Sequence, residues 1–336
     1  MIAFKTIFAD VQEVTVTTKS HQVFAFLTLG ATWTKWTTAS GIDLVARYED
    51  YREYRSPGMY LGTTVGPLSG RIRDGIIESF GEKIVVDCGH PHLLHSGKYG
   101  FSFINFTISK AKEEDDVTTI TFETSYPHPF LKGQIDVCVS YVIKEEGLTI
   151  VYDAVSTEDT LLNLTNHAYF NLDGDYDRPM DSHLLQINGE EVVLVDDEVL
   201  GIDRMKVNGS VFDFRHKKPV MPSVLDPLLK HQGANGIDHY YVLNADREAD
   251  VVLTSTLSKR TLTIHSSYPG ITVYTTNYPS SNARIQTGRM LTQHASIAME
   301  PHFQQLAIKD SYYPGYRLNH GEPYHHWIRY RLEESK

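Results

Sequence analysis

The sequence predicts an all-β protein built from large antiparallel sheets, and three observations lead to this prediction. Short runs rich in Val, Thr, Ile, Tyr and Phe recur along the chain, separated by turn signals. The 336 residues include 20 Tyr and 14 Phe but only 3 Trp, a bias that favours strands. No long amphipathic helical pattern separates the runs. We therefore predict sheets stacked face to face in a large β-sandwich, and we exclude TIM-barrel and Rossmann folds, which need helices between strands.

The first half of the chain alternates strand-like runs with turns, and Gly30 and Gly41 mark two of the turns. The segment YEDYREY is the best helical candidate there, and it is barely two turns long. The expected strands are EVTVTTKS, QVFAFLTLG, ATWTKWTTA, EKIVVDC, SFINFTISK, DVTTITFETSY, QIDVCVSYVI and LTIVYDAVS.

The second half continues in the same way, with expected strands at LLQINGEEVVLVD, HYYVLNA, ADVVLTSTLS, RTLTIHSS, ITVYTTN and YHHWIRYRLEE. No linker rich in Pro, Gly or Ser divides the halves, and no repeat of fixed period is present. We therefore expect residues 1–336 to form a single domain.

Charge and composition limit the classes of partner. The formal net charge of -11 argues against nucleic acid, whose phosphate backbone requires clustered Lys and Arg, and suits a neutral small molecule. No apolar run approaches the length of a membrane span, and the first residues lack the pattern of a signal peptide, so we expect a cytoplasmic protein without membrane contact. Cys88 and Cys138 are the two cysteines, which suggests neither a disulfide framework nor a thiolate metal site.

The segment NLTNHAYFNL, residues 163–172, has an unusual polar side. With the two-residue period of a strand, Leu164, Ala168, Phe170 and Leu172 fall on one apolar side. The opposite side carries His167 among uncharged hydrogen-bonding groups, where a solvent-facing strand would normally include Lys or Glu. Either His167 is a buried histidine bonded to its neighbours, or this side faces a polar ligand.

Four further stretches place an ionisable side chain where neither a core nor a plain surface needs one: GPLSGRIRDG with Arg71, HPHLLHSGKYGF with His95, GIDHYYVL with Asp238 and ASIAMEPH with Glu300. Three of these residues also have a plainer interpretation, while His95, before Ser96 and Gly97, is expected in a turn that presents its imidazole. Arg71 is otherwise a surface arginine, Asp238 caps a turn and Glu300 ends a strand at the surface. The small Ser296 and Ala298 on the expected face of Glu300 would leave space for a cleft.

Other chemistries have weaker support. His90, His92 and His95 suggest a metal site because His-x-His puts two ligands on one strand face, but no acidic ligand follows, so we expect no metal. P-loop, GxGxxG, GxSxG and HExxH patterns are absent from the sequence, which removes the usual support for nucleotide binding, α/β-hydrolase and zinc-protease chemistry.

Taken in order, the five stretches resemble the galactose mutarotase (aldose 1-epimerase) family. The likeness begins at GIDLVARYEDYREYRSPGMYLGTTVGPLSGRIRDG, includes VFDFRHKKP and YPGITVYTTN, and covers nearly the whole chain. It implies a β-supersandwich and an isomerase that interconverts the α and β anomers of a free aldose such as galactose or glucose.

By this resemblance His167 is the general acid and Glu300 the general base, while Arg71, His95 and Asp238 bind the sugar. No cofactor is required, and the resemblance is compatible with a monomer or a homodimer. A carboxylate beside His167 would favour its protonated form, which the role of acid requires.

The chain departs from the family pattern at two places. Pro301 and His302 follow Glu300 where Thr and Gln are usual, which alters the wall beside the base. Pro67 stands where an arginine is common, and Ser96 replaces a glycine after the expected sugar-binding histidine. These departures put the preferred sugar in doubt.

Three alternatives to a galactose or glucose epimerase stay open at this point. A maltose or hexose-6-phosphate 1-epimerase would use the same fold, and a phosphate would call for further cations such as Arg73 and Lys98. A carbohydrate-binding or sensing protein would need no matched acid and base. A glycosidase would need two carboxylates flanking one bond.

Overall fold

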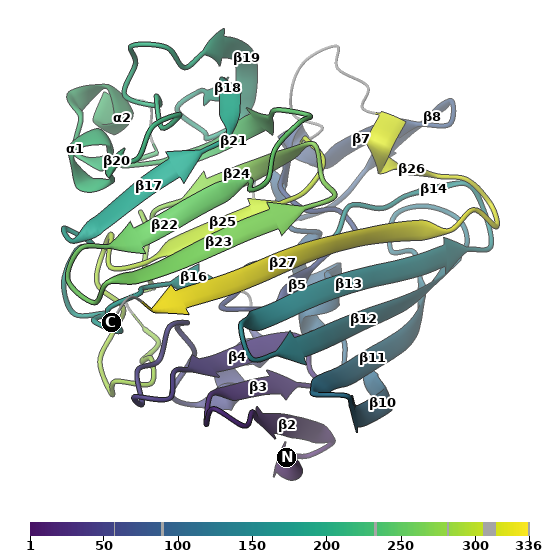
Figure 1. The fold of residues 1–336 in the computed structure, drawn as a ribbon. Coiled ribbons are helices and arrows are strands. Elements are labelled where there is room, and N and C mark those ends of the chain that lie inside the picture. The colour runs from purple at the N-terminus through teal and green to yellow at the C-terminus, as the bar shows by residue number, and fades with distance from the viewer. Residues whose placement is uncertain (57, 89–90, 232–233, 281, 305–313, 335–336) are drawn as a thin grey trace.

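The computed structural model describes residues 1–56, 58–88, 91–231, 234–280, 282–304 and 314–334. Antiparallel strands dominate the described chain, and they lie in stacked layers (Figure 1). The predicted all-β class is confirmed. No helix among these residues is long and apolar enough to cross a bilayer.

The largest sheet has nine strands within the described residues. It begins as a meander in which each strand pairs with the next one in sequence. In spatial order the strands are β10 (Thr107–Glu114), β11 (Val117–Pro127), β12 (Gln134–Lys144), β13 (Gly147–Ser156), β27 (Tyr324–Glu334), β23 (Arg260–Ser266), β22 (Val251–Ser255), β17 (His183–Ile187) and β20 (Lys218–Pro219).

The C-terminal strand β27 lies in the interior of this sheet. It pairs with β13 on one side, where Ile150 faces Ile328, and with β23 on the other, where Ile264 faces Tyr330. The last described strand thus joins the meander β10–β13 to the strands from the second half of the chain (Figure 1).

A second sheet lies behind the first in Figure 1 and carries the candidate site. It has six described strands, in the order β16 (Tyr169–Phe170), β25 (Ile297–Pro301), β24 (Gly270–Tyr274), β21 (Asp238–Leu243), β18 (Gly189–Val195) and β19 (Gly201–Lys206). The core strands β24 and β25 alternate apolar and polar residues, so one face is available for a core and the other for a ligand.

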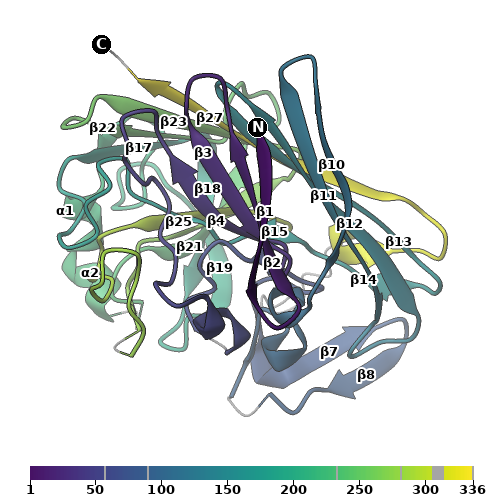
Figure 2. The same cartoon turned by 90° about the horizontal axis from the view of Figure 1, so that it is seen from below.

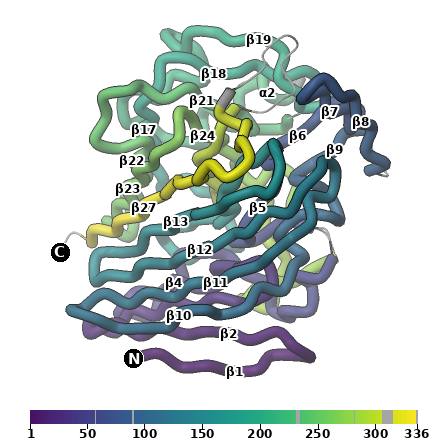
Figure 3. Tube along the Cα trace, turned by 90° about the vertical axis from the view of Figure 1, so that its right-hand side faces the viewer, coloured from purple at the N-terminus to yellow at the C-terminus, as the bar shows by residue number. Residues whose placement is uncertain are grey.

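The N-terminal sheet has four described strands: β1 (Ile2–Phe8), β2 (Val11–Thr17), β3 (Val23–Leu27) and β4 (Thr32–Thr37). From below, these strands lie beside β10 and β11 (Figure 2). The tube in Figure 3 shows the same neighbourhood, with β1 as the outer strand. Most of β1 is exposed, as expected for an edge strand.

Short pairs and single turns complete the described elements. The pairs are β5 (Thr64–Val65) with β15 (Thr165–Asn166), β6 (Arg71–Ile72) with β9 (Leu93–Leu94), β7 (Ile76–Ser79) with β8 (Glu82–Val85), and β14 (Thr160–Leu161) with β26 (Arg317–Leu318). The helices are α1 (Met221–Val224), α2 (Pro227–His231) and the 3-10 turns η1 (Tyr51–Arg55), η2 (Arg73–Gly75), η3 (Gly97–Tyr99), η4 (Phe101–Phe103) and η5 (Pro314–Tyr316).

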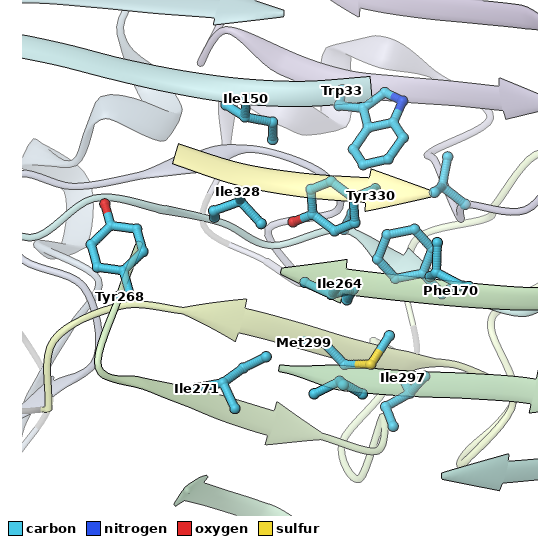
Figure 4. Close-up of a cluster of buried hydrophobic side chains, with 14 of the residues drawn as sticks. Trp33, Ile150, Phe170, Ile264, Tyr268, Ile271, Ile297, Met299, Ile328 and Tyr330 are labelled. Carbon is cyan, nitrogen blue, oxygen red and sulfur yellow. The ribbon is translucent and has the colours of Figure 1, made fainter. Parts of the chain in front are cut away.

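The main core lies between the two large sheets. Aromatic rings pack at its centre, where Trp33 meets the rings of Phe170 and Tyr330 edge to face, at centroid distances of 5.7 and 5.2 Å (Figure 4). Ile297 and Met299 of β25 extend into the same core (Figure 4). Burying such side chains stabilises the fold by about 1.5–3 kcal/mol each, so this packing fixes β25 in position.

Two expectations about strands need correction. The segment LLQINGEEVVLVD is divided at Asn188 between β17 and β18, which belong to different sheets. The side chain of Asn188 accepts a hydrogen bond from Asn244 (2.9 Å), which holds the chain at this crossing. NLTNHAYFNL is likewise two short strands, β15 and β16, because residues 167–168 lie between them.

Candidate active site

The alternation of β24 and β25 separates core side chains from pocket side chains. Ile297 and Met299 belong to the core, whereas Ala298 and Glu300 lie on the other face. Glu300 lines a pocket of about 330 Å³, a size typical of small-molecule sites. A cleft therefore lies beside Glu300 as expected, but Ala298 is not part of its lining, since this residue is fully buried in a hydrophobic cluster with Tyr169.

His167 is carried to Glu300 by backbone contacts with the segment around Gly62. The N–H of His167 donates to the carbonyl of Thr63 (3.1 Å), and its carbonyl accepts from the N–H of Gly62 (2.9 Å). Gly62 has a φ of 70°, and a Cβ there would lie 2.0 Å from the carbonyl oxygen of Trp33, so the close approach requires glycine.

The two proposed catalytic side chains meet in the pocket. His167 Nε2 lies 3.4 Å from Glu300 Oε1, and the two side chains are only 7% and 3% exposed. The imidazole of His167 stacks on the ring of Tyr169 at 4.9 Å, which fixes its plane. From the polar side of NLTNHAYFNL, His167 and Tyr169 line the pocket, whereas Asn163 and Asn171 donate to backbone carbonyls of Phe303 and Ala295.

The protonation expected for this pair is wrong. Burial lowers the pKa of His167 to about 3, and the nearby His302 and Arg71 act in the same direction. Burial also raises the pKa of Glu300 well above its usual value, and the charge of Asp238 adds to that shift. Loss of solvation thus outweighs the attraction between the two groups and favours their neutral forms.

Arg71 and Asp238 form an ion pair at the pocket. Arg71 lies on β6 and Asp238 begins β21, and Arg71 Nη1 donates to Asp238 Oδ2 at 3.2 Å. Their side chains are 22% and 9% exposed, so Arg71 is not a plain surface arginine. Both side chains line the same pocket as Glu300.

His95 lies in a strained turn after β9. Its φ is 52°, and Gly70 donates its backbone N–H to His95 Nδ1 (3.1 Å). Ser96 stabilises the turn by donating to the carbonyl of Leu68 (3.1 Å) and accepting from its N–H (2.9 Å). This turn presents the imidazole of His95 to the pocket, and Ser96 is part of what holds it.

By distance alone, the side chains of His95, His167 and Glu300 are suitably placed to bind one metal ion. The ligand atoms of His95, His167 and Glu300 lie within 4.8 Å of one another, and two imidazoles with a carboxylate suit several divalent metals. However, His95 Nδ1 accepts the N–H of Gly70, so its neutral ring carries the proton on Nε2. A nitrogen that holds a proton cannot ligate, and the cluster therefore suits a hydroxyl acceptor better than a metal.

The metal site suggested by His90, His92 and His95 does not form among the described residues. His92 Nδ1 accepts from the backbone of Asp74 (3.0 Å) and its Nε2 lies 3.4 Å from Glu198. His95 faces the catalytic pocket instead. His90 lies outside the described residues.

Several pocket residues carried no signal of function in the sequence. The structure adds Tyr60, Tyr169, Thr272, Tyr274 and His302 to the lining. Of these, Tyr169 belongs to the polar side of NLTNHAYFNL and His302 departs from the family pattern beside Glu300, whereas the sequence singles out none of the other three. His302 lies in the pocket lining, so this departure is part of the wall next to Glu300.

The match to known proteins agrees with this geometry. A family model described as aldose 1-epimerase matches residues 12–331. The chain belongs to the aldose 1-epimerase family. It is therefore a carbohydrate epimerase, an isomerase, as the resemblance predicted.

Individual relatives show how far the likeness extends. The galactose mutarotase of Sus scrofa is 28% identical over 289 residues, which cover 84% of this chain and 82% of that protein. The maltose epimerase of Levilactobacillus brevis is 26% identical over 331 residues, with 96% and 95% covered. The crystal structure of galactose 1-epimerase from Lactobacillus acidophilus NCFM matches with a TM-score of 0.88 at 22% identity, over 100% of this chain and 99% of that one. This structural match shows that the epimerase has the same fold.

Proposed function

We propose that this epimerase interconverts the α and β anomers of free galactose or glucose by opening and reclosing the sugar ring. The observation that supports the proposal is the buried pair His167 and Glu300, 3.4 Å apart in a pocket of about 330 Å³. A binding protein needs polar contacts but no acid and base in contact with each other.

The reaction needs one proton removed and one delivered. Glu300 takes the proton of the C1 hydroxyl while His167 protonates the ring oxygen, and the bond between C1 and the ring oxygen breaks to give the open aldehyde. Rotation about the C1–C2 bond presents the other face of the carbonyl. The same two groups then reverse their steps and close the ring to the other anomer. None of these steps uses a cofactor.

The pair performs this chemistry if His167 and Glu300 share one transferable proton, which is either on the carboxyl group or on the imidazole. Burial favours that proton on Glu300 when the site holds no sugar. The C1 hydroxyl of a bound sugar donates a hydrogen bond to the carboxyl group of Glu300. This bond replaces the solvation that burial removes, and it favours the charged carboxylate. The proton then moves to His167 across the 3.4 Å gap, which gives the acid and the base their assigned roles.

Arg71, His95 and Asp238 hold the remaining hydroxyls in the proposed complex. Arg71 and, through its Nε2 proton, His95 act as donors, whereas Asp238 accepts. Since the ion pair of Arg71 with Asp238 balances its own charge, the pocket suits a neutral sugar. Arg73, a candidate phosphate ligand, pairs with Asp196 at 3.1 Å, which disfavours a hexose 6-phosphate.

Polarimetry tests the proposal. Freshly dissolved α-galactose and α-glucose are followed with and without the protein, and the protein is expected to speed the approach to anomeric equilibrium. If the folded protein accelerates mutarotation of none of the common aldoses, the proposal is wrong, and sugar binding without turnover becomes the better explanation of the pocket.

Variants then test the two residues. Glu300→Gln and His167→Asn are each expected to lower kcat by about 10²–10⁴-fold, the usual contribution of a positioned proton-transfer group. Glu333→Gln and His325→Asn on β27 are matched controls, because both side chains are exposed and lie on the other large sheet. Full activity in either pocket variant would remove that residue from its role.

A second candidate function is epimerisation of maltose. A further pocket of about 680 Å³ adjoins the catalytic one and shares Tyr60, Arg71 and Leu94 with it, so a second sugar unit has room beside the first. The relative from Levilactobacillus brevis is named for this substrate. Maltose mutarotation measured beside that of glucose distinguishes the two, since a maltose epimerase has the higher kcat/KM for the disaccharide.

A further inference from the structure

Thr272 lies directly beside Glu300 and has no assigned role. The two residues are register partners on the neighbouring strands β24 and β25, so their side chains extend from the same face of the sheet about 4.5–5.5 Å apart at Cβ. Thr272 is 5% exposed and lines the catalytic pocket. Its hydroxyl is therefore available to a sugar whose C1 atom lies at Glu300.

His167 and Thr272 flank Glu300 on opposite sides. Strand β16 pairs with β25 on one edge, with Tyr169 opposite Ala298, and His167 precedes this strand. Strand β24, which carries Thr272, pairs with the other edge of β25. The order across the pocket floor is thus His167, Glu300, Thr272.

His302 determines which way the Thr272 hydroxyl points. His302 Nδ1 lies 2.5 Å from the carbonyl oxygen of Phe303, and a carbonyl only accepts, so Nδ1 carries the proton. Burial lowers the pKa of His302 to about 4, and the ring is neutral at pH 7. Nε2 then accepts, and Thr272 Oγ1 donates its hydrogen to it at 2.8 Å. The threonine oxygen consequently offers only lone pairs to the pocket.

We propose that Thr272 accepts a hydrogen bond from the 2-hydroxyl of the substrate, and that His302 is the positioning residue that keeps Thr272 an acceptor. In an aldopyranose, C1 is bonded to the ring oxygen and to C2. With C1 at Glu300 and the ring oxygen toward His167, C2 and its hydroxyl lie on the remaining side, which is that of Thr272. The inference rests on the proposed function and specifies its substrate class, an aldose with a free hydroxyl at C2.

The test compares galactose with 2-deoxygalactose, which lacks only this hydroxyl. After subtraction of the uncatalysed rate, the unmodified protein is expected to prefer galactose in kcat/KM by about tenfold, the loss typical of one hydrogen bond. Thr272→Val is expected to lower kcat/KM for galactose about tenfold and to leave 2-deoxygalactose nearly unchanged, so the preference disappears. Thr272→Ser keeps the hydroxyl and should therefore retain the preference for galactose.

His302→Phe tests the positioning role. Without Nε2 as acceptor, the Thr272 hydroxyl rotates freely, and the preference for galactose is expected to shrink while turnover of 2-deoxygalactose persists. Thr254→Val on β22 is the matched control, because Thr254 bonds only to Thr261 across the nine-stranded sheet. A second control sugar, 6-deoxygalactose, keeps the 2-hydroxyl, so Thr272→Val should lower its kcat/KM by the same factor as that of galactose.

The possible outcomes separate the two proposals. Absence of turnover with every aldose overturns the proposed function. Activity with equal kcat/KM for galactose and 2-deoxygalactose in the unmodified protein, or an undiminished preference in Thr272→Val, overturns the role of Thr272 alone. If Thr272→Val does not fold, His302→Phe still tests the role, because an undiminished preference for galactose in that variant contradicts it.

Discussion

Glu300→Gln is expected to make the protein more stable while it removes activity. The carboxyl group is 3% exposed, and burial raises its pKa well above the value of 4.5 that it has in the unfolded chain. At pH 7 the unfolded chain ionises this group, whereas the folded protein disfavours its charge. Folding therefore carries a free-energy cost that a neutral amide of nearly the same shape avoids.

The size and sign of this effect follow from proton binding. Because the folded pKa is raised, the folded state binds more protons, and the stability of the unmodified protein falls as the pH rises from 4.5 toward the raised pKa. The slope is about 1.4 kcal/mol for each pH unit. The advantage of Glu300→Gln over the unmodified protein should thus grow by about 1.4 kcal/mol per unit in this window.

Denaturant unfolding at pH 5, 6 and 7 measures the effect. Other titrating groups are shared by the two proteins, so the difference in unfolding free energy isolates Glu300. The exposed control Glu333→Gln should change the unfolding free energy by no more than about 0.5 kcal/mol. A difference between Glu300→Gln and the unmodified protein that stays constant with pH, or that falls as the pH rises, would refute the reasoning.

Three further outcomes follow from the site. The kcat/KM for galactose should stay level from pH 7 down to pH 5, because the imidazole of His167, with a pKa of about 3, is not protonated by solvent in this range. A pH profile of kcat/KM that falls with a midpoint near 6.5 would contradict this. Gly62→Ala should lower the free energy of unfolding, measured with denaturant, by more than about 1–2 kcal/mol. Gly209→Ala is the control and should cost less, because Gly209 has nearly the same φ (71° against 70°) but, unlike Gly62, has no backbone atoms close to the added Cβ. Asp238→Asn should raise KM about ten- to hundredfold with a smaller effect on kcat in steady-state kinetics, because it removes a charged hydrogen-bonding group; an unchanged KM would exclude contact with the sugar.

Local patterns in the sequence predicted individual strands well. Strand β12 alternates exposed and buried residues almost without interruption, and such alternation is visible in the letters alone. The proposed helical segment YEDYREY overlaps the 3-10 turn η1, which has Asp50 as its N-cap and ends one residue beyond the segment. Strand β1 was not predicted, since most of it is exposed and its sequence lacks a clear alternation.

Contacts between distant segments could not be predicted in this way. The pairing of β27 with β13 and β23 depends on tertiary packing rather than on any local period. The residue patterns indicate His167 and Glu300 as candidates and the resemblance assigns their roles, but only the structure shows that they lie 3.4 Å apart. Their protonation was predicted in the wrong direction because burial cannot be read from a single segment. Thr272 lies in the run ITVYTTN, where a threonine is simply a common strand residue.

The interior position of β27 constrains how the protein is made. Until Tyr324–Glu334 have been synthesised, β13 and β23 have no partner along the edges that later meet on this strand. Two open edges rich in backbone donors and acceptors invite pairing with other chains. The largest sheet can therefore close only after Tyr324–Glu334 have been synthesised. Because Ile328 and Tyr330 of β27 belong to the main core, the core against which β25 and Glu300 are held is complete only when this strand is in place.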